Sequence, residues 1–178
     1  MKNLFVLILF SLVVVLPALA QEELSVLRTK AEQGDKEAQY SLGVRYDKGE
    51  GVPKDSVEAV RWFLKAAEQG DAKAPYNLGV MYDKGEGVPK DSVEAVRWYR
   101  KGAEQGYAKA QFNLGAMYAA GDGVPKDLVQ AHMWFNLSGA KGREEAKRNL
   151  KIIEKQMSAE QKAEAMKLAR DRGAKANP

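Results

Sequence analysis

The sequence predicts an all-α fold: a solenoid of about three 36-residue helix-turn-helix repeats, closed by a C-terminal capping helix. Two observations carry this prediction. A Gln-Gly pair recurs three times at a spacing of 36 residues, starting at Gln33. Residues 36–71 and 72–107 are identical at 27 of 36 positions, and residues 108–142 form a more divergent third copy. Internal similarity at a fixed period of this length is typical of stacked repeats.

Residues 1–20 have the pattern of a secretory signal peptide. Lys2 is followed by an apolar run from Leu4 to Leu16, and Ala18-Leu19-Ala20 supplies the small residues of a cleavage site. The run is shorter than the roughly 20 residues that span a bilayer comfortably. We therefore expect cleavage after Ala20 rather than an uncleaved membrane anchor. The mature chain would then be periplasmic or secreted.

Residues 21–142 hold the repeats, and a partial unit precedes the first full one. Each unit is expected to begin with a helix that has two apolar stripes. In the first unit, Ala38, Leu42 and Tyr46 share one stripe, while Tyr40 and Val44 lie on the opposite side. A helix that is apolar on two sides is expected to pack between neighbours.

A loop rich in glycine and proline, residues 49–54, separates this helix from the second one and recurs in the later units. Asp55 then has the position of an N-cap, and Glu58 is expected to complete a capping box. Pro75 is expected to shift the start of its helix by one or two residues. The second helix carries four apolar residues at helical spacing: Ala59, Trp62, Phe63 and Ala66.

Glycines recur at one place inside the first helices. A glycine in a helix costs about 1 kcal/mol relative to alanine, so we expect each to permit a close helix–helix contact. The predicted partner of each glycine is the tryptophan of the second helix. The structural residues are therefore Gly43, Gly79 and Gly115 with Trp62, Trp98 and Trp134.

Residues 143–178 are expected to form capping helices and a basic tail. One helix is predicted over 144–156, and Ser158 with Gln161 forms a capping box for a last helix that ends near Arg172. Residues 141–178 contain 11 basic and 6 acidic residues. We interpret this excess as a solvated helix face, with weak contact to an anionic surface as the alternative.

The composition excludes several kinds of functional site. Among 178 residues there are no cysteines and one histidine, His132, which removes thiolate metal sites, cysteine nucleophiles and His-rich metal centres. No aromatic residue follows Phe135 in the basic C-terminal part, so base stacking with a nucleic acid is not supported. No metal, cofactor, nucleic acid or membrane-spanning segment of the mature chain is therefore expected.

The units share one ordered pattern: A-x-x-x-L-G-x-x-Y-x-x-G-x-G-V-x-x-D-x-x-x-A-x-x-W, followed by a small residue and a closing glycine. This pattern resembles that of the Sel1-like repeat (SLR) family, relatives of the tetratricopeptide repeats. The resemblance covers about residues 22–156. It implies a right-handed α/α superhelical solenoid that acts as an adaptor. We therefore expect a non-catalytic exported scaffold that binds a partner protein or peptide in its concave groove, in cell-envelope regulation or host interaction.

The predicted groove consists of the polar arc of the first helices. An asparagine ladder at a 36-residue interval has the groups to bond a peptide backbone, and two methionines offer adaptable apolar contact. Repeat duplication alone also explains the recurring asparagine. The groove residues are Glu37, Ser41, Arg45, Lys73, Asn77, Met81, Lys109, Asn113, Met117 and Asn149.

The alternative function is a cell-envelope enzyme, or a protein that binds peptidoglycan fragments or β-lactams. Ser138-Gly139-Ala140-Lys141 matches the S-x-x-K nucleophile motif, but the S-D-N and K-T-G motifs that accompany it in serine β-lactamases are missing from the sequence. A secreted factor that acts on host proteins is a third possibility. His132 lies beside Trp134 and is interpreted as a packing residue.

Overall fold

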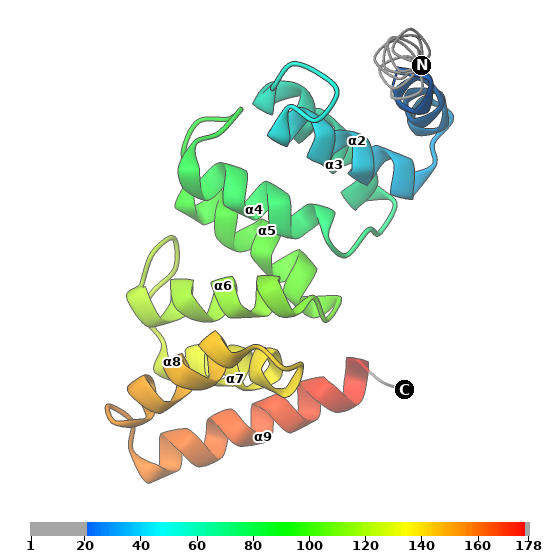
Figure 1. The fold of residues 1–178 in the computed structure, drawn as a ribbon. Coiled ribbons are helices and arrows are strands. Elements are labelled where there is room, and N and C mark those ends of the chain that lie inside the picture. The colour runs from blue at the N-terminus through cyan, green and yellow to red at the C-terminus, as the bar shows by residue number, and fades with distance from the viewer. Residues whose placement is uncertain (1–20, 177–178) are drawn as a thin grey trace, which may run out of the picture.

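The computed structural model describes residues 21–176, and the predicted signal peptide, residues 1–20, lies outside this range. The described residues are helical with short connections (Figure 1). A helical segment over residues 21–32 precedes the repeats. The helices that follow are α2 (Lys36–Lys48), α3 (Ser56–Glu68), α4 (Ala74–Lys84), α5 (Ser92–Glu104), α6 (Ala108–Ala120), α7 (Leu128–Ala140), α8 (Glu144–Glu154) and α9 (Ala159–Ala176).

The helices form a stack of antiparallel pairs, which confirms the predicted α/α solenoid. Within the units, α2 packs on α3, α4 on α5, and α6 on α7. Each second helix also packs on the first helix of the next unit, so that α3 contacts α4 and α5 contacts α6. The pairs therefore follow one another along a single axis (Figure 1).

The predicted N-caps of the second helices are confirmed, but the capping boxes are not. The Asp55 carboxylate accepts hydrogen bonds from the backbone N–H groups of Val57 and Glu58, both at 3.0 Å. The Glu58 carboxylate does not return to the cap, because it pairs with Arg61 at 2.6 Å. Glu94 pairs with Arg97 in the same way in the next unit.

The first helices end in the same left-handed turn. Gly49, Gly85 and Gly121 have φ angles of 74°, 74° and 78°, a conformation that side chains with a Cβ rarely adopt. The start of α4 at Ala74 lies two residues later in the repeat than the start of α2 at Lys36. Pro75 stands in the first turn of α4, as the sequence predicted.

Each first helix contributes to two core clusters. Leu42 of α2 packs with Ala38 and Trp62 in a cluster that faces the N-terminal segment. Tyr40 and Val44 of the same helix pack on the next cluster, which contains Phe63 and residues of α4. The helix thus lies between two neighbours, as its two apolar stripes predict.

The prediction that tryptophans pack on the helical glycines is wrong, and the next residue in the sequence makes this contact. A Cβ added to Gly43 would lie 2.7 Å from the Phe63 ring, and one added to Gly115 would lie 2.8 Å from Phe135. Gly79 faces Tyr99 in the same manner. Adjacent residues of a helix point about 100° apart. The tryptophan and the aromatic residue that follows it therefore contact different neighbouring helices.

The tryptophans pack toward the preceding unit. Trp62 joins the cluster with Ala31 and Leu42, and Trp98 packs against the cluster that contains Phe63. Trp134 is 2% exposed and lies in a cluster with Tyr99. In each second helix the tryptophan therefore packs on the preceding unit, and the aromatic residue after it packs on the following unit.

The C-terminal part folds back onto the third unit. The predicted capping box is confirmed: Gln161 accepts from the Ser158 backbone N–H at 2.9 Å, and the Ser158 hydroxyl accepts from the Gln161 N–H at 3.2 Å. Helix α9 packs along α7 and continues to Ala176, four residues beyond the predicted end. Ala165 and Ala169 are buried on its inner side, so α9 covers the open end of the array.

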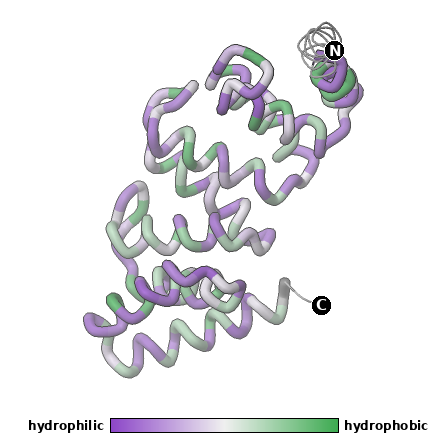
Figure 2. The backbone as a smooth tube through the Cα atoms, viewed as in Figure 1, coloured by the Kyte–Doolittle hydropathy of each residue, from purple (hydrophilic) through white to green (hydrophobic). Residues whose placement is uncertain are grey.

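Hydrophobic and hydrophilic residues alternate along the helices (Figure 2). Among residues 21–176, no helix has the length and apolar character needed to cross a membrane.

Replacing Gly79 with alanine is expected to lower the free energy of unfolding by roughly 1–3 kcal/mol, because the new Cβ would collide with the Tyr99 ring. The matched control is Gly173→Ala in α9, where a Cβ would lie 3.8 Å from Leu137, an ordinary contact. This control should raise stability by up to about 1 kcal/mol, since alanine is the better helix former. Chemical denaturation checks both values, and an unchanged midpoint for Gly79→Ala would refute the proposed role of the glycines.

Candidate functional site

The predicted groove residues belong to α2, α4, α6 and α8, and we call the surface made by these helices the first-helix face. The exposure of their side chains differs from position to position. Four of them are exposed: Glu37, Ser41, Lys73 and Lys109. Four are half-buried: Arg45, Asn77, Asn113 and Asn149.

The two methionines are buried, which corrects their predicted role in the groove. Met81 is 2% exposed and packs with Val60, Phe63 and Leu78. Met117 is 7% exposed and belongs to the cluster around Trp134. Their place in the repeat corresponds to Arg45 of the first unit and lies off both apolar stripes of the helix, so the position was expected to be exposed. The methionines are therefore core residues rather than ligand contacts.

The lysines of the face contact aromatic rings of the preceding first helix. Lys73 Nζ lies 5.6 Å from the centre of the Tyr40 ring, and Lys109 Nζ lies 6.0 Å from that of Tyr76. At the next step Arg143 lies 4.5 Å from the centre of the Phe112 ring. Cation–π contacts at exposed sites stabilise by about 0.5–1 kcal/mol each. The face is thus a row of half-buried rings with a cation over each one. The sequence pattern predicted these rings only as core residues.

The three asparagines of the ladder do not have the same surroundings. Asn113 hydrogen-bonds to the Tyr99 hydroxyl. The residues that correspond to Tyr99 in the neighbouring units are Phe63 and Phe135, which have no hydroxyl. Asn77 and Asn149 therefore lack this particular partner and keep more of their hydrogen-bonding capacity for a ligand.

An apolar pocket opens between α6 and α8 on the first-helix face. It has a volume of about 350 Å³, and Asn149 lies at its wall together with the exposed Ile152. Ala119 and Ala120 line it from α6, where the first two units have Asp-Lys. The loss of both charges in the third unit was a sequence signal for this pocket that the repeat comparison did not use.

The S-x-x-K residues serve the packing of the repeat. The Ser138 hydroxyl is buried and donates a hydrogen bond to the Ala108 carbonyl at 2.8 Å. Lys141 Nζ donates to the carbonyl of Gly106, so that both side chains hold the end of α7 against the start of α6. His132 is buried, and its Nε2 lies 3.1 Å from Oε1 of Glu154 in α8.

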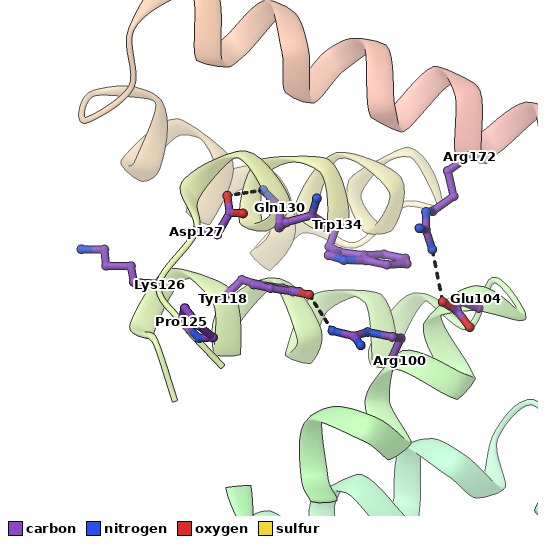
Figure 3. Close-up of a pocket in the computed structure, with 9 residues that line it drawn as sticks. All are labelled: Arg100, Glu104, Tyr118, Pro125, Lys126, Asp127, Gln130, Trp134 and Arg172. Atoms are coloured by element: carbon purple, nitrogen blue, oxygen red, sulfur yellow. Dashed lines mark hydrogen bonds and ion pairs between the residues drawn. The ribbon is translucent and has the colours of Figure 1, made fainter. Parts of the chain in front are cut away.

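A second, polar pocket lies on the other side of the third unit and was not predicted from the sequence. It has a volume of about 600 Å³ and lies between α5, α6, α7 and α9. The indole of Trp134 stands between Tyr118 and Arg172 in this pocket (Figure 3).

Stacked helix pairs with shared cores and a capped end define the chain as an α/α solenoid repeat protein. A model of the Sel1 repeat matches residues 36–71, 72–107 and 108–142, more than half of the chain. The chain therefore belongs to the Sel1 repeat family. Proteins of this family generally act as protein-interaction scaffolds and are mostly non-enzymatic.

Three relatives illustrate the similarity. A Sel1 repeat protein from Oxalobacter formigenes is 42% identical, with a TM-score of 0.71 over 74% of this chain and 54% of that one. A protective antigen of uropathogenic Escherichia coli with an SLR fold is 38% identical, with a TM-score of 0.74 over 84% of this chain and 33% of that one. The secretory immunoglobulin A-binding protein EsiB of Escherichia coli is 47% identical over 58 residues, which are 33% of this chain and 12% of that protein. The chain thus spans little more than half, or less, of these relatives.

The Tyr99→Phe variant is expected to resist alkaline unfolding better than the wild type. Burial raises the pKa of the Tyr99 phenol, and the hydrogen bond from Asn113 opposes this only in part. The folded state therefore holds the proton more tightly than the unfolded chain, and the wild type loses stability as the pH rises above about 10. Melting temperatures of both proteins between about pH 8 and pH 11.5 measure the difference. Parallel curves would show that the Tyr99 phenol does not contribute.

Proposed function

We propose that this chain is an exported, non-catalytic adaptor that holds a peptide segment of a partner protein on its first-helix face. The partner would belong to the cell envelope or to a host. Binding would use the half-buried rings and the pocket between α6 and α8 for apolar side chains, while Asn77 and Asn149 bond to the peptide backbone.

The observation that carries this proposal is the pocket between α6 and α8. Its position between consecutive first helices places it next to Asn149, and it combines an amide with the exposed Ile152 and the alanines of α6. An apolar pocket beside a hydrogen-bonding amide suits one side chain of a peptide and its adjoining backbone.

The relatives support an adaptor that meets other proteins outside the cytoplasm. One is named as a binder of secretory immunoglobulin A, and another is described as a protective antigen. Both relatives are much longer than this chain, which covers 12% and 33% of their lengths.

The described contacts do not favour the enzyme alternative. A catalytic serine needs a free hydroxyl next to its base. The Ser138 hydroxyl is instead buried and hydrogen-bonded to the Ala108 carbonyl, and the Lys141 ammonium is hydrogen-bonded to the Gly106 carbonyl.

A variant with three arginines on the first-helix face, Ser41→Arg, Asn77→Arg and Asn149→Arg, is expected to lose its partner. The larger charged side chains would block the face without entering the core, because none of the three residues is buried. Crosslinking in envelope extract, followed by mass spectrometry, compares the partners of the variant and the wild type.

The matched control places three arginines on exposed apolar positions of the second helices and α9: Val57→Arg, Val93→Arg and Met166→Arg. This control should keep the partner. Circular dichroism verifies that both proteins are folded. Loss of the partner in the control alone would put the interface on the second helices.

We further infer that residues 1–20 direct export and are removed after Ala20. N-terminal sequencing of the protein recovered from the periplasm or the medium should give Gln21 as the first residue. An Ile8→Arg variant, which interrupts the apolar run, should leave the uncleaved chain in the cytoplasm. Recovery of the intact N-terminus from the membrane fraction would instead indicate an anchor.

A further inference from the structure

The polar pocket around Trp134 is built from four helices and a loop. Arg100 of α5 donates a hydrogen bond to the Tyr118 hydroxyl at 2.6 Å, which holds its guanidinium at the floor (Figure 3). Arg172 of α9 lies 4.6 Å from the centre of the Trp134 ring and 3.5 Å from the Glu104 carboxylate. Lys126, Gln130 and Pro125 complete the lining from the loop and α7.

The pocket has a surplus of positive charge. Three cations line it: Arg100, Lys126 and Arg172. The two carboxylates in the lining are already engaged, because Asp127 accepts the Gln130 backbone N–H at 3.0 Å and Glu104 pairs with Arg172. One positive charge is therefore left for a ligand.

The third unit differs from the other two at the positions that set this charge. Gln130 stands where the first two units have Glu58 and Glu94, so a carboxylate has been removed from the lining. In those units a lysine of the same helix lies over the tryptophan, with Lys65 at 4.3 Å from the Trp62 ring. Leu137 replaces this lysine in the third unit, and Arg172 from α9 supplies the cation instead.

The indole N–H of Trp134 is an unused hydrogen-bond donor in the pocket lining. The side chain is 2% exposed, and its Nε1 has no hydrogen-bond partner among the described residues. Buried donors are nearly always paired in folded proteins. Arg172 covers part of the Trp134 ring, and its side chain is 42% exposed and held by the exposed Glu104 carboxylate at 3.5 Å. An acceptor that enters beside Arg172 would satisfy the N–H.

We propose that this pocket binds a side-chain carboxylate of an acidic peptide segment in a partner protein. Two guanidinium groups and an indole N–H match the two oxygens of a carboxylate. A surplus of one positive charge suits a carboxylate better than a doubly charged phosphate. The Trp134 ring and Pro125 provide apolar walls for the methylenes of a glutamate. Among the described residues, Lys126 is the one that lines both this pocket and the pocket between α6 and α8, and the proposal does not depend on binding at the first-helix face.

The test is a titration of the ¹⁵N-labelled protein with a capped hexaglutamate peptide, followed through the three indole N–H resonances. Trp134→Phe identifies the Trp134 resonance. That resonance should move downfield and saturate, because its N–H gains an acceptor, while those of Trp62 and Trp98 stay in place. Capped hexaglutamine should cause no shift. Saturable shifts of all three resonances, or an equal response to hexaglutamine, would overturn the proposal.

Two variants test the charge of the pocket. Arg100→Gln and Gln130→Glu should each weaken hexaglutamate binding about tenfold, because each removes or cancels a charge-assisted hydrogen bond. Gln130→Glu restores the residue that the fold accepts at Glu58 and Glu94, so loss of binding in this variant is not due to unfolding.

The matched control is Arg28→Gln. Arg28 donates to the Tyr46 hydroxyl at 3.0 Å, as Arg100 does to Tyr118, so the change in net charge and in local bonding is the same. This variant should bind hexaglutamate like the wild type. An equal loss in Arg28→Gln would show non-specific charge attraction. The same titration is run with inorganic phosphate. If the Trp134 resonance shifts at a lower concentration of phosphate than of hexaglutamate carboxylate groups, the pocket is a phosphate site and the proposal is overturned.

Discussion

The contact between an aromatic ring and a glycine backbone decides how close the two helices of each unit come. A side chain larger than hydrogen at Gly43, Gly79 or Gly115 would hold the second helix away. Because the ring occupies this contact, the tryptophan one residue earlier must point to the preceding unit. The single-residue offset therefore produces both the tight pair and the continuous core between pairs. The stacking of the array follows from it.

The same geometry leaves two different surfaces. On the first-helix face, the rings of Tyr40, Tyr76 and Phe112 stay half-buried under cations of the next unit. On the opposite side a cation also lies over each tryptophan: Lys65 and Lys101 of the same helix in the first two units, and Arg172 of α9 in the third. Where α9 provides it, a pocket with spare donors results. The candidate sites are thus places where one repeat departs from its neighbours.

Most of the fold could be predicted from the sequence, because its period, caps and apolar stripes are local features. The Asp55 N-cap and the late start of α4 at Pro75 follow from short-range rules. The glycine partner was missed because Trp62 and Phe63 are adjacent and equally apolar, and only the three-dimensional packing distinguishes them. The burial of Met81 was missed because its position lies off both apolar stripes of the helix, and its counterpart in the first unit is the polar Arg45. The pocket around Trp134 joins residues as far apart as Arg100 and Arg172, and no repeat pattern brings such residues together.

Helix α9 determines at which place in the array a repeat unit can be added. Met133 and Leu137 replace Arg61 and Lys65 of the first unit, and both join the cluster that receives Ala169 and Leu168 of α9. The third unit is thus specialised as a dock for the terminating helix. A unit inserted after it would separate α9 from these residues and uncover them. Duplication of the middle unit, which is identical to its predecessor at 27 of 36 positions, would lengthen the protein without disturbing either end.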